Sequence, residues 1–260
     1  MNKKIRKILK KKNRSKIVSL TAYSKNVAQI IDKYCDIVLV GDSMANVLYG
    51  MENTHKITLQ NMIQHTLSVK KGIKKSLLVV DMPKGSYKNI NTAKKNAKLI
   101  MKVTKCDAVK IESNNKNFNI VKALTKIKVP VMGHIGFTPQ FKRKFKLEGD
   151  TRKKIDDLLK EAKLIEKAGA FCIVLECITQ NASKIITNNL NIPTIGIGSS
   201  ASCDGQILVT DDMLGLSGFY PKFVKKYLSL DRLIDKSVKK YARDVKLNKF
   251  PAKKNFLYGR

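Results

Sequence analysis

Short apolar runs alternate with longer segments of helical periodicity along most of the chain. Runs rich in Val, Ile and Leu are typical of buried strands, and the sequence has eight: residues 17–23, 37–40, 77–80, 108–113, 129–132, 172–175, 194–197 and 206–209. Apolar residues at three- and four-residue steps predict helices at residues 26–34, 58–70, 92–103, 118–127, 151–168 and 182–188. Strands that alternate with helices pair in parallel, because each crossover needs about a dozen residues.

The number of strands favours a closed barrel. Eight parallel strands close a (β/α)8 barrel, whose active site lies at the carboxyl ends of its strands. The alternative, an open doubly wound sheet, would place a glycine-rich nucleotide loop after the first strand. The residues at that place are T-A-Y-S-K-N at 21–26, which do not form such a loop. We therefore expect an α/β fold of the (β/α)8, or TIM barrel, class.

Length and composition indicate one domain. A chain of 260 residues, 43% hydrophobic and 28% charged, suits a single barrel. We expect one domain over residues 1–260, with a basic N-terminal arm at residues 1–15 and a C-terminal helical extension at about residues 228–260. The basic helical stretch at residues 230–247 is expected to pack outside the barrel or against a partner subunit.

The formal net charge of +32 raises the possibility of a nucleic-acid partner. Lysine is spread along the whole chain and greatly outnumbers arginine, whereas readers of bases and phosphates usually favour the bidentate arginine fork. No helix-turn-helix, zinc-finger or RNA-binding aromatic signature accompanies the charge. We expect no nucleic-acid partner, and we attribute the charge to a bias in residue usage that can also steer small anionic substrates.

The N-terminus and the cysteines point to a cytoplasmic protein. The first residues are positive but lack the apolar stretch of a signal peptide, and no run is long enough to cross a membrane. The five cysteines form no C-x-x-C pair, so we expect reduced thiols and no zinc. We therefore expect no membrane partner.

The run A-V-K-I-E-S at residues 108–113 is unusual for a buried strand, because it carries a lysine and a carboxylate. Strand side chains alternate, so Lys110 and Glu112 share one face, while Val109 and Ile111 share the other. Burying an unpaired charge is costly, so the charged face belongs either to an exposed edge or to a binding site.

Five successive strands end in a polar side chain that can do chemistry. These residues are Asp42, Asp81, Glu112, His134 and Glu176. A single Asp after a strand is more often a turn former. Five such residues at equivalent positions would converge at the top of a barrel, which favours an active site.

The types of these residues suggest separate roles. Three crowded carboxylates need a compensating cation, and oxygen ligands favour a hard ion, so Asp42, Asp81 and Glu112 are the expected Mg²⁺ ligands. Lys110 can hold an anionic substrate group or balance the carboxylates. His134 could be a ligand, an acid or base, or an orienting donor. A carboxylate walled by apolar residues has a raised pKa, so Glu176 is the candidate general base.

Several motifs resemble the ketopantoate hydroxymethyltransferase family, from about residue 16 to residue 227. They are V-G-D-S at 40–43, L-L-V-V-D-M-P at 77–83, V-K-I-E at 109–112, P-V-M-G-H-I-G-F-T-P-Q at 130–140, V-L-E-C at 174–177 and C-D-G-Q-I-L-V at 203–209. The resemblance implies a (β/α)8 barrel of the phosphoenolpyruvate/pyruvate type. It also implies a homo-oligomer, commonly a decamer.

The resemblance further implies a reaction and a set of roles. The family makes 2-dehydropantoate from 3-methyl-2-oxobutanoate and 5,10-methylenetetrahydrofolate, through a Mg²⁺-stabilised enolate, as the first step toward pantothenate. By motif, Asp42, Asp81 and Glu112 would bind Mg²⁺; Asp42, Ser43, Asp81 and Lys110 would contact the keto acid, which His134 would help orient; and Glu176 would accept the proton.

The chain departs from the family pattern outside these positions. Ser24, Ala45, Asn46 and Lys84 stand where the family usually has other residues, and the loop after Gln140 is short and basic. These changes bear on the folate pocket more than on the type of reaction. Two other functions compete: a Mg²⁺-dependent lyase or mutase of the same fold, and a basic nucleic-acid-binding protein built on a degraded barrel.

Overall fold

The computed structural model of the protein describes residues 2–113, 117–142, 145–218 and 220–256. The chain divides into two compact units, Met1–Thr210 and Asp211–Arg260. The first unit contains a closed barrel of parallel strands in sequence order, β1 to β8. The predicted TIM barrel is therefore confirmed.

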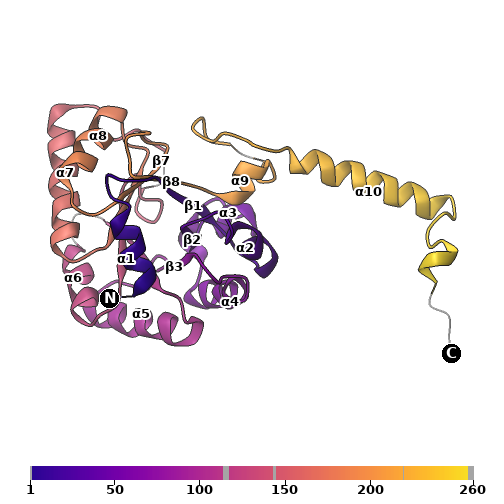
Figure 1. Ribbon diagram of the computed structural model, residues 1–260, viewed down its shortest axis with the longest axis horizontal. Coiled ribbons are helices and arrows are strands. Elements are labelled where there is room, and N and C mark those ends of the chain that lie inside the picture. The colour runs from indigo at the N-terminus through magenta and orange to yellow at the C-terminus, as the bar shows by residue number, and fades with distance from the viewer. Residues whose placement is uncertain (1, 114–116, 143–144, 219, 257–260) are drawn as a thin grey trace. The chain divides into compact units, whose positions relative to one another are not determined.

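All eight expected strands are present in the barrel (Figure 1). Their bounds are β1 Ile17–Thr21, β2 Ile37–Val40, β3 Leu77–Asp81, β4 Ala108–Glu112, β5 Val131–Gly136, β6 Cys172–Glu176, β7 Thr194–Ile197 and β8 Gly205–Leu208. Each differs from the predicted range by a few residues at most, except that β5 extends past His134 to Gly136.

Helices surround the strands, and each long helix from α2 to α8 contacts the next one along the chain (Figure 1). The long helices of this layer are α2 Lys25–Ile31, α4 Leu59–Lys70, α5 Ile90–Thr104, α6 Phe118–Lys126, α7 Arg152–Lys167 and α8 Gln180–Asn189. The short helices α3 Met44–Val47, η1 Thr54–Lys56 and α9 Thr210–Leu214 were not predicted. Thr58 caps α4, since its hydroxyl accepts a hydrogen bond from the Asn61 backbone N–H.

Alternating side chains divide the barrel into two cores. Val109 and Ile111 belong to the outer core, between the strands and the helices. Ala108 belongs to a separate inner core with the first residues of other strands, such as Ile17, Ile37 and Leu77. The predicted division of residues 108–113 into two faces is confirmed, and Lys110 and Glu112 are buried inside the barrel.

The N-terminal arm contains an unpredicted helix, α1 Lys3–Lys10. Its Ile5 and Ile8 are each 2% exposed and join the inner core with the first residues of the strands. Lys12 anchors the following turn, because its Nζ lies 2.9 Å from the Asp204 carboxylate. The helix therefore closes the amino end of the barrel, opposite the end where catalytic residues are expected.

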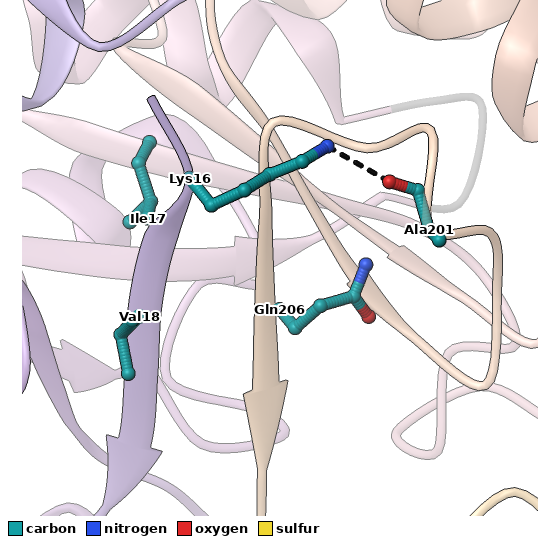
Figure 2. A pocket seen from close by; sticks show the side chains of 5 residues that line it. All are labelled: Lys16, Ile17, Val18, Ala201 and Gln206. Carbon is teal, nitrogen blue, oxygen red and sulfur yellow. Dashed lines mark hydrogen bonds between the residues drawn. The ribbon is translucent and has the colours of Figure 1, made fainter.

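The outer surface of β1 and β8 is less well covered than the rest of the barrel. Val18 is 47% exposed, and a hollow of about 360 Å³ is lined by Lys16, Ile17, Val18, Ala201 and Gln206 (Figure 2). The Lys16 ammonium crosses it to donate to the Ala201 carbonyl at 2.8 Å.

The second unit contains the amphipathic helix α10 Leu230–Lys246, none of whose residues is buried. Ile234, Val238, Tyr241 and Val245 follow one another at three- and four-residue steps, and each is more than 40% exposed. Within the described part of its unit, the Phe250 ring lies edge-on to Tyr241, and the stripe otherwise stays exposed. In the described residues, no helix is both long and apolar enough to cross a membrane.

Candidate active site

The strand ends bring the predicted site residues together inside the barrel. Asp81, Glu112 and Glu176 are the last residues of β3, β4 and β6, and Asp42 lies two residues beyond β2. The strand register sets Asp81 beside Lys110 and Glu112 beside His134. Adjacent strands lie about 4.8 Å apart, so the residues of each pair are neighbours in space.

Lys110 is the positive centre of the cluster. Its Nζ lies 2.7 Å from Asp81 Oδ1 and 3.5 Å from His134 Nδ1. Burial alone lowers the pKa of Lys110, but the carboxylates of Asp81, Glu112 and Asp42 outweigh burial and raise it. The lysine is therefore charged at neutral pH, as required for a group that holds anions.

The carboxyl groups lack enough positive charge around them. Burial, followed by the nearby Asp81 carboxylate, raises the pKa of Asp42 to about 7. Burial and the Asp42 carboxylate raise the pKa of Glu112 well above its usual range. Burial raises the pKa of Glu176 to about 8. The buried carboxyl groups of the cluster thus outnumber the one lysine that can balance their charge.

His134 links Lys110 to Glu176. Its Nε2 lies 3.1 Å from Glu176 Oε2, and its Nδ1 lies 3.8 Å from Glu112 Oε1. Burial and the Lys110 ammonium lower the pKa of His134, so the ring is neutral at neutral pH. Since Nδ1 faces the Lys110 ammonium and can only accept from it, the ring proton is placed on Nε2. Although Glu176 Oε2 is near, Nε2 has no hydrogen-bond partner in the described structure, so its N–H is available to orient a bound molecule.

The Glu176 side chain is mostly buried but more exposed to solvent than its neighbours in the cluster. Its side chain is 13% exposed, whereas those of Glu112 and His134 are 1% and 3% exposed. The next residue, Cys177, has a φ of 51°, a conformation that costs a residue other than glycine about 1–2 kcal/mol. Its backbone N–H donates to the Ile197 carbonyl and its carbonyl accepts from Glu148, so both neighbouring segments hold this turn.

Gln140 is a site residue that sequence reasoning did not identify, although it ends one of the quoted motifs. Its Nε2 donates to Asp42 Oδ2 at 2.8 Å, and its backbone N–H donates to Glu112 Oε2 at 2.9 Å. The buried Tyr87 hydroxyl donates to its Oε1. A buried glutamine in a loop has no periodic signal, so only the three-dimensional contacts reveal it.

The remaining candidates lie at the edge of the cluster. Ser43 Oγ is 2.9 Å from the Tyr23 hydroxyl, on the turn that also carries Asp42. The other two histidines contact loops near the site. His55 Nε2 is 3.0 Å from the Pro139 carbonyl, and His65 Nδ1 is 2.8 Å from the Tyr23 carbonyl.

The side chains fit a hard divalent cation in ligand type and charge, since three buried carboxylates adjoin one lysine. Within the described ranges, no group of three or more His, Cys, Asp or Glu side chains is arranged as a metal centre. Oxygens of Asp42 and Asp81 instead contact Gln140 and Lys110. The Mg²⁺ site therefore stays a prediction that the donor chemistry favours.

The chain matches a protein-family model described as ketopantoate hydroxymethyltransferase over residues 2–253. A 3-methyl-2-oxobutanoate hydroxymethyltransferase of Pelagibacter ubique (strain HTCC1062) is 51% identical over 255 residues, which cover 98% of this chain and 99% of that protein. An enzyme of the same name from Anaplasma marginale (strain St. Maries) is 46% identical over 244 residues, covering 93% and 88%.

Solved structures confirm the type of barrel. A 2,3-dimethylmalate lyase, a member of the PEP mutase/isocitrate lyase superfamily, superposes with a TM-score of 0.61 at 13% identity, covering 99% of this chain and 93% of that one. A phosphoenolpyruvate phosphomutase from Streptomyces platensis subsp. rosaceus gives a TM-score of 0.64 at 12% identity, covering 94% and 87%. At these identities the likeness concerns the fold alone.

The raised pKa of Glu176 predicts a pH-dependent stability. A carboxyl group whose pKa is higher in the folded protein stabilises the fold at low pH, and this contribution is lost as pH rises through about 8. We expect Glu176→Gln, measured by urea unfolding in EDTA, to be on the order of 1–3 kcal/mol more stable than the unmodified chain at pH 9. The difference should shrink toward pH 5, and a difference independent of pH would contradict the assignment.

Proposed function

The chain belongs to the ketopantoate hydroxymethyltransferase family, and from this premise we propose that it transfers a hydroxymethyl group from 5,10-methylenetetrahydrofolate to 3-methyl-2-oxobutanoate. The product is 2-dehydropantoate, the first intermediate on the way to pantothenate. The observation that carries the proposal is the buried cluster at the strand ends, in which Glu176 adjoins Lys110 through His134. Deprotonation of a keto acid requires a general base, here a glutamate, beside a positive group that binds the substrate carboxylate, here a lysine.

Asp42, Asp81 and Glu112 would hold Mg²⁺. When bound, the ion would polarise the keto group of the substrate and so lower the pKa of its C3–H. Burial, followed by the neighbouring carboxylate, raises the pKa of Asp42 and Glu112, and this supports the assignment because buried, crowded carboxylates need a positive partner.

The residues of the chain divide the remaining work. Lys110 offers its ammonium to the substrate carboxylate, and Asp42, Ser43 and Asp81 would also contact the keto acid. Glu176 accepts the proton from C3, and burial, which raises its pKa to about 8, makes its ionised form a stronger base than an exposed carboxylate. His134, whose Nε2 has no hydrogen-bond partner in the described structure, would help orient the keto acid.

The carbon–carbon bond forms next. The methylene carbon is bonded to two folate nitrogens, so both C–N bonds must break. The bond from C3, made with the electron pair left there, replaces one of them, and the bond to a water oxygen, which becomes the new hydroxyl group, replaces the other. The two nitrogens keep the electrons of the broken bonds and take up the proton that Glu176 removed from C3 and the proton that water releases, which gives tetrahydrofolate.

Hydrogen exchange at C3 tests the proposal. The chain should exchange the C3 hydrogen of 3-methyl-2-oxobutanoate with deuterated water when Mg²⁺ is present and should lose this activity in EDTA. Removing the base should slow exchange by about 10²–10⁴-fold, so Glu176→Gln should be almost inactive when followed by proton NMR. Formation of 2-dehydropantoate should require the folate in addition.

A matched control is Glu166→Gln, which removes a carboxylate from α7 that accepts the backbone N–H of Asn191 far from the cluster. This variant should exchange at the unmodified rate. Exchange by Glu176→Gln at the control rate would rule out Glu176 as the base. Exchange without any folate-dependent product would instead favour a lyase or mutase of the same fold.

We also propose that the chain forms a homo-oligomer, a decamer by family resemblance, and works in the cytoplasm. The exposed apolar stripe of α10 supports the first part, because a stripe of this kind is stabilised by a second copy. The five cysteines, all buried and free, support the second, because reduced thiols are the rule in that compartment.

Light scattering after size-exclusion chromatography measures the oligomer. The mass should be a multiple of 29.2 kDa, and ten copies would give the decamer. Val238→Glu, on the apolar stripe of α10, should lower the mass, whereas Lys236→Glu on another face of the helix should not. A monomeric unmodified chain would contradict the proposal.

A further inference from the structure

The loop after β5 places one buried glutamine against the carboxylate cluster. Gln140 is 1% exposed, and its Nε2 donates to Asp42 Oδ2 at 2.8 Å and to the Met82 carbonyl at 3.0 Å. Its backbone N–H donates to Glu112 Oε2 at 2.9 Å. One residue therefore restrains two carboxylates that come from different strands and repel each other.

The orientation of the Gln140 amide is fixed by its partners. The Asp42 carboxylate and the Met82 carbonyl are acceptors, so the NH₂ group must face them. The Oε1 atom then faces Tyr87, whose hydroxyl donates to it from the loop between β3 and α5. Tyr87 is 5% exposed, so this contact is shielded from water. Turning the amide over would place two acceptors against each other at Asp42.

We propose that Gln140 is a positioning residue that holds Asp42 and Glu112 in the orientation in which they bind a divalent cation, with Tyr87 acting through Gln140. The inference rests on the proposed function, which assigns these carboxylates to the cation. Groups that hydrogen-bond to metal ligands orient them, and their loss typically weakens metal binding by about 10–100-fold.

Direct measurement of Mn²⁺ binding tests this role without relying on turnover. In Gln140→Leu, the Asp42 carboxylate loses its side-chain donor while the backbone donor to Glu112 remains. We expect about 10–100-fold weaker Mn²⁺ binding, measured by electron paramagnetic resonance on the full chain. The apparent Mn²⁺ requirement for C3 exchange should rise by a similar factor, and kcat should largely recover at saturating Mn²⁺.

The matched control is Asn96→Leu, which also removes a side-chain amide donor near this loop. Asn96 Nδ2 donates to the Ser86 carbonyl at 2.7 Å and contacts no carboxylate in the described structure. This variant should unfold more easily than the unmodified chain yet bind Mn²⁺ with unchanged affinity, which separates positioning from a general loss of stability.

Tyr87→Phe tests the chain of contacts and stands in for Gln140→Leu if the latter does not fold. It should weaken Mn²⁺ binding by a smaller factor. Combining it with Gln140→Leu should add nothing further, because Tyr87 acts only through Gln140. Additive effects of the two changes would overturn that part of the proposal.

Different results contradict the proposed function and the role of Gln140. If the unmodified chain binds no Mn²⁺ and exchanges no C3 hydrogen, the proposed function is wrong. If the unmodified chain does both and Gln140→Leu binds Mn²⁺ as tightly as Asn96→Leu, the proposed function stands and the role of Gln140 is wrong.

Discussion

The structure depends on a charge imbalance at the carboxyl ends of the strands. Several buried carboxyl groups converge around one buried lysine, whose Nζ lies 2.7 Å from Asp81. Burial raises the pKa of Asp42, Glu112 and Glu176, and Lys110 lowers these values without cancelling the rise. Such a cluster is costly to bury, so its presence is best explained by ligands that complete it.

The barrel supplies the geometry that makes this imbalance useful. The parallel register sets Asp81 beside Lys110 and Glu112 beside His134. His134 of β5 in turn lies next to Glu176 of β6. The apolar residues of the same strands face the helices or fill the inner core, which α1 closes at the other end. Rigid strands therefore hold the charged side chains, while loops supply partners such as Gln140 and Tyr87.

Much of this arrangement was predictable because it follows the two-residue period of strands. Lys110 and Glu112 interrupt an apolar run on one face of their strand. Each of the other three carboxylates follows an apolar run in the sequence: Asp42, Asp81 and Glu176. Gln140 and Tyr87 could not be found in this way, because they lie in loops whose path depends on the folded barrel. The buried positions of Ile5 and Ile8 could not be predicted for another reason. Lysines surround both residues in the sequence, so a helix with a narrow buried face resembles a basic arm.

The central claim is that the carboxylates of Asp42, Asp81 and Glu112 share a divalent cation. The most direct test is the anomalous difference map of a crystal of the protein grown with Mn²⁺. The account predicts a single strong peak in contact with oxygens of these three side chains. A map with no peak there, or with Mn²⁺ bound only elsewhere, would contradict it.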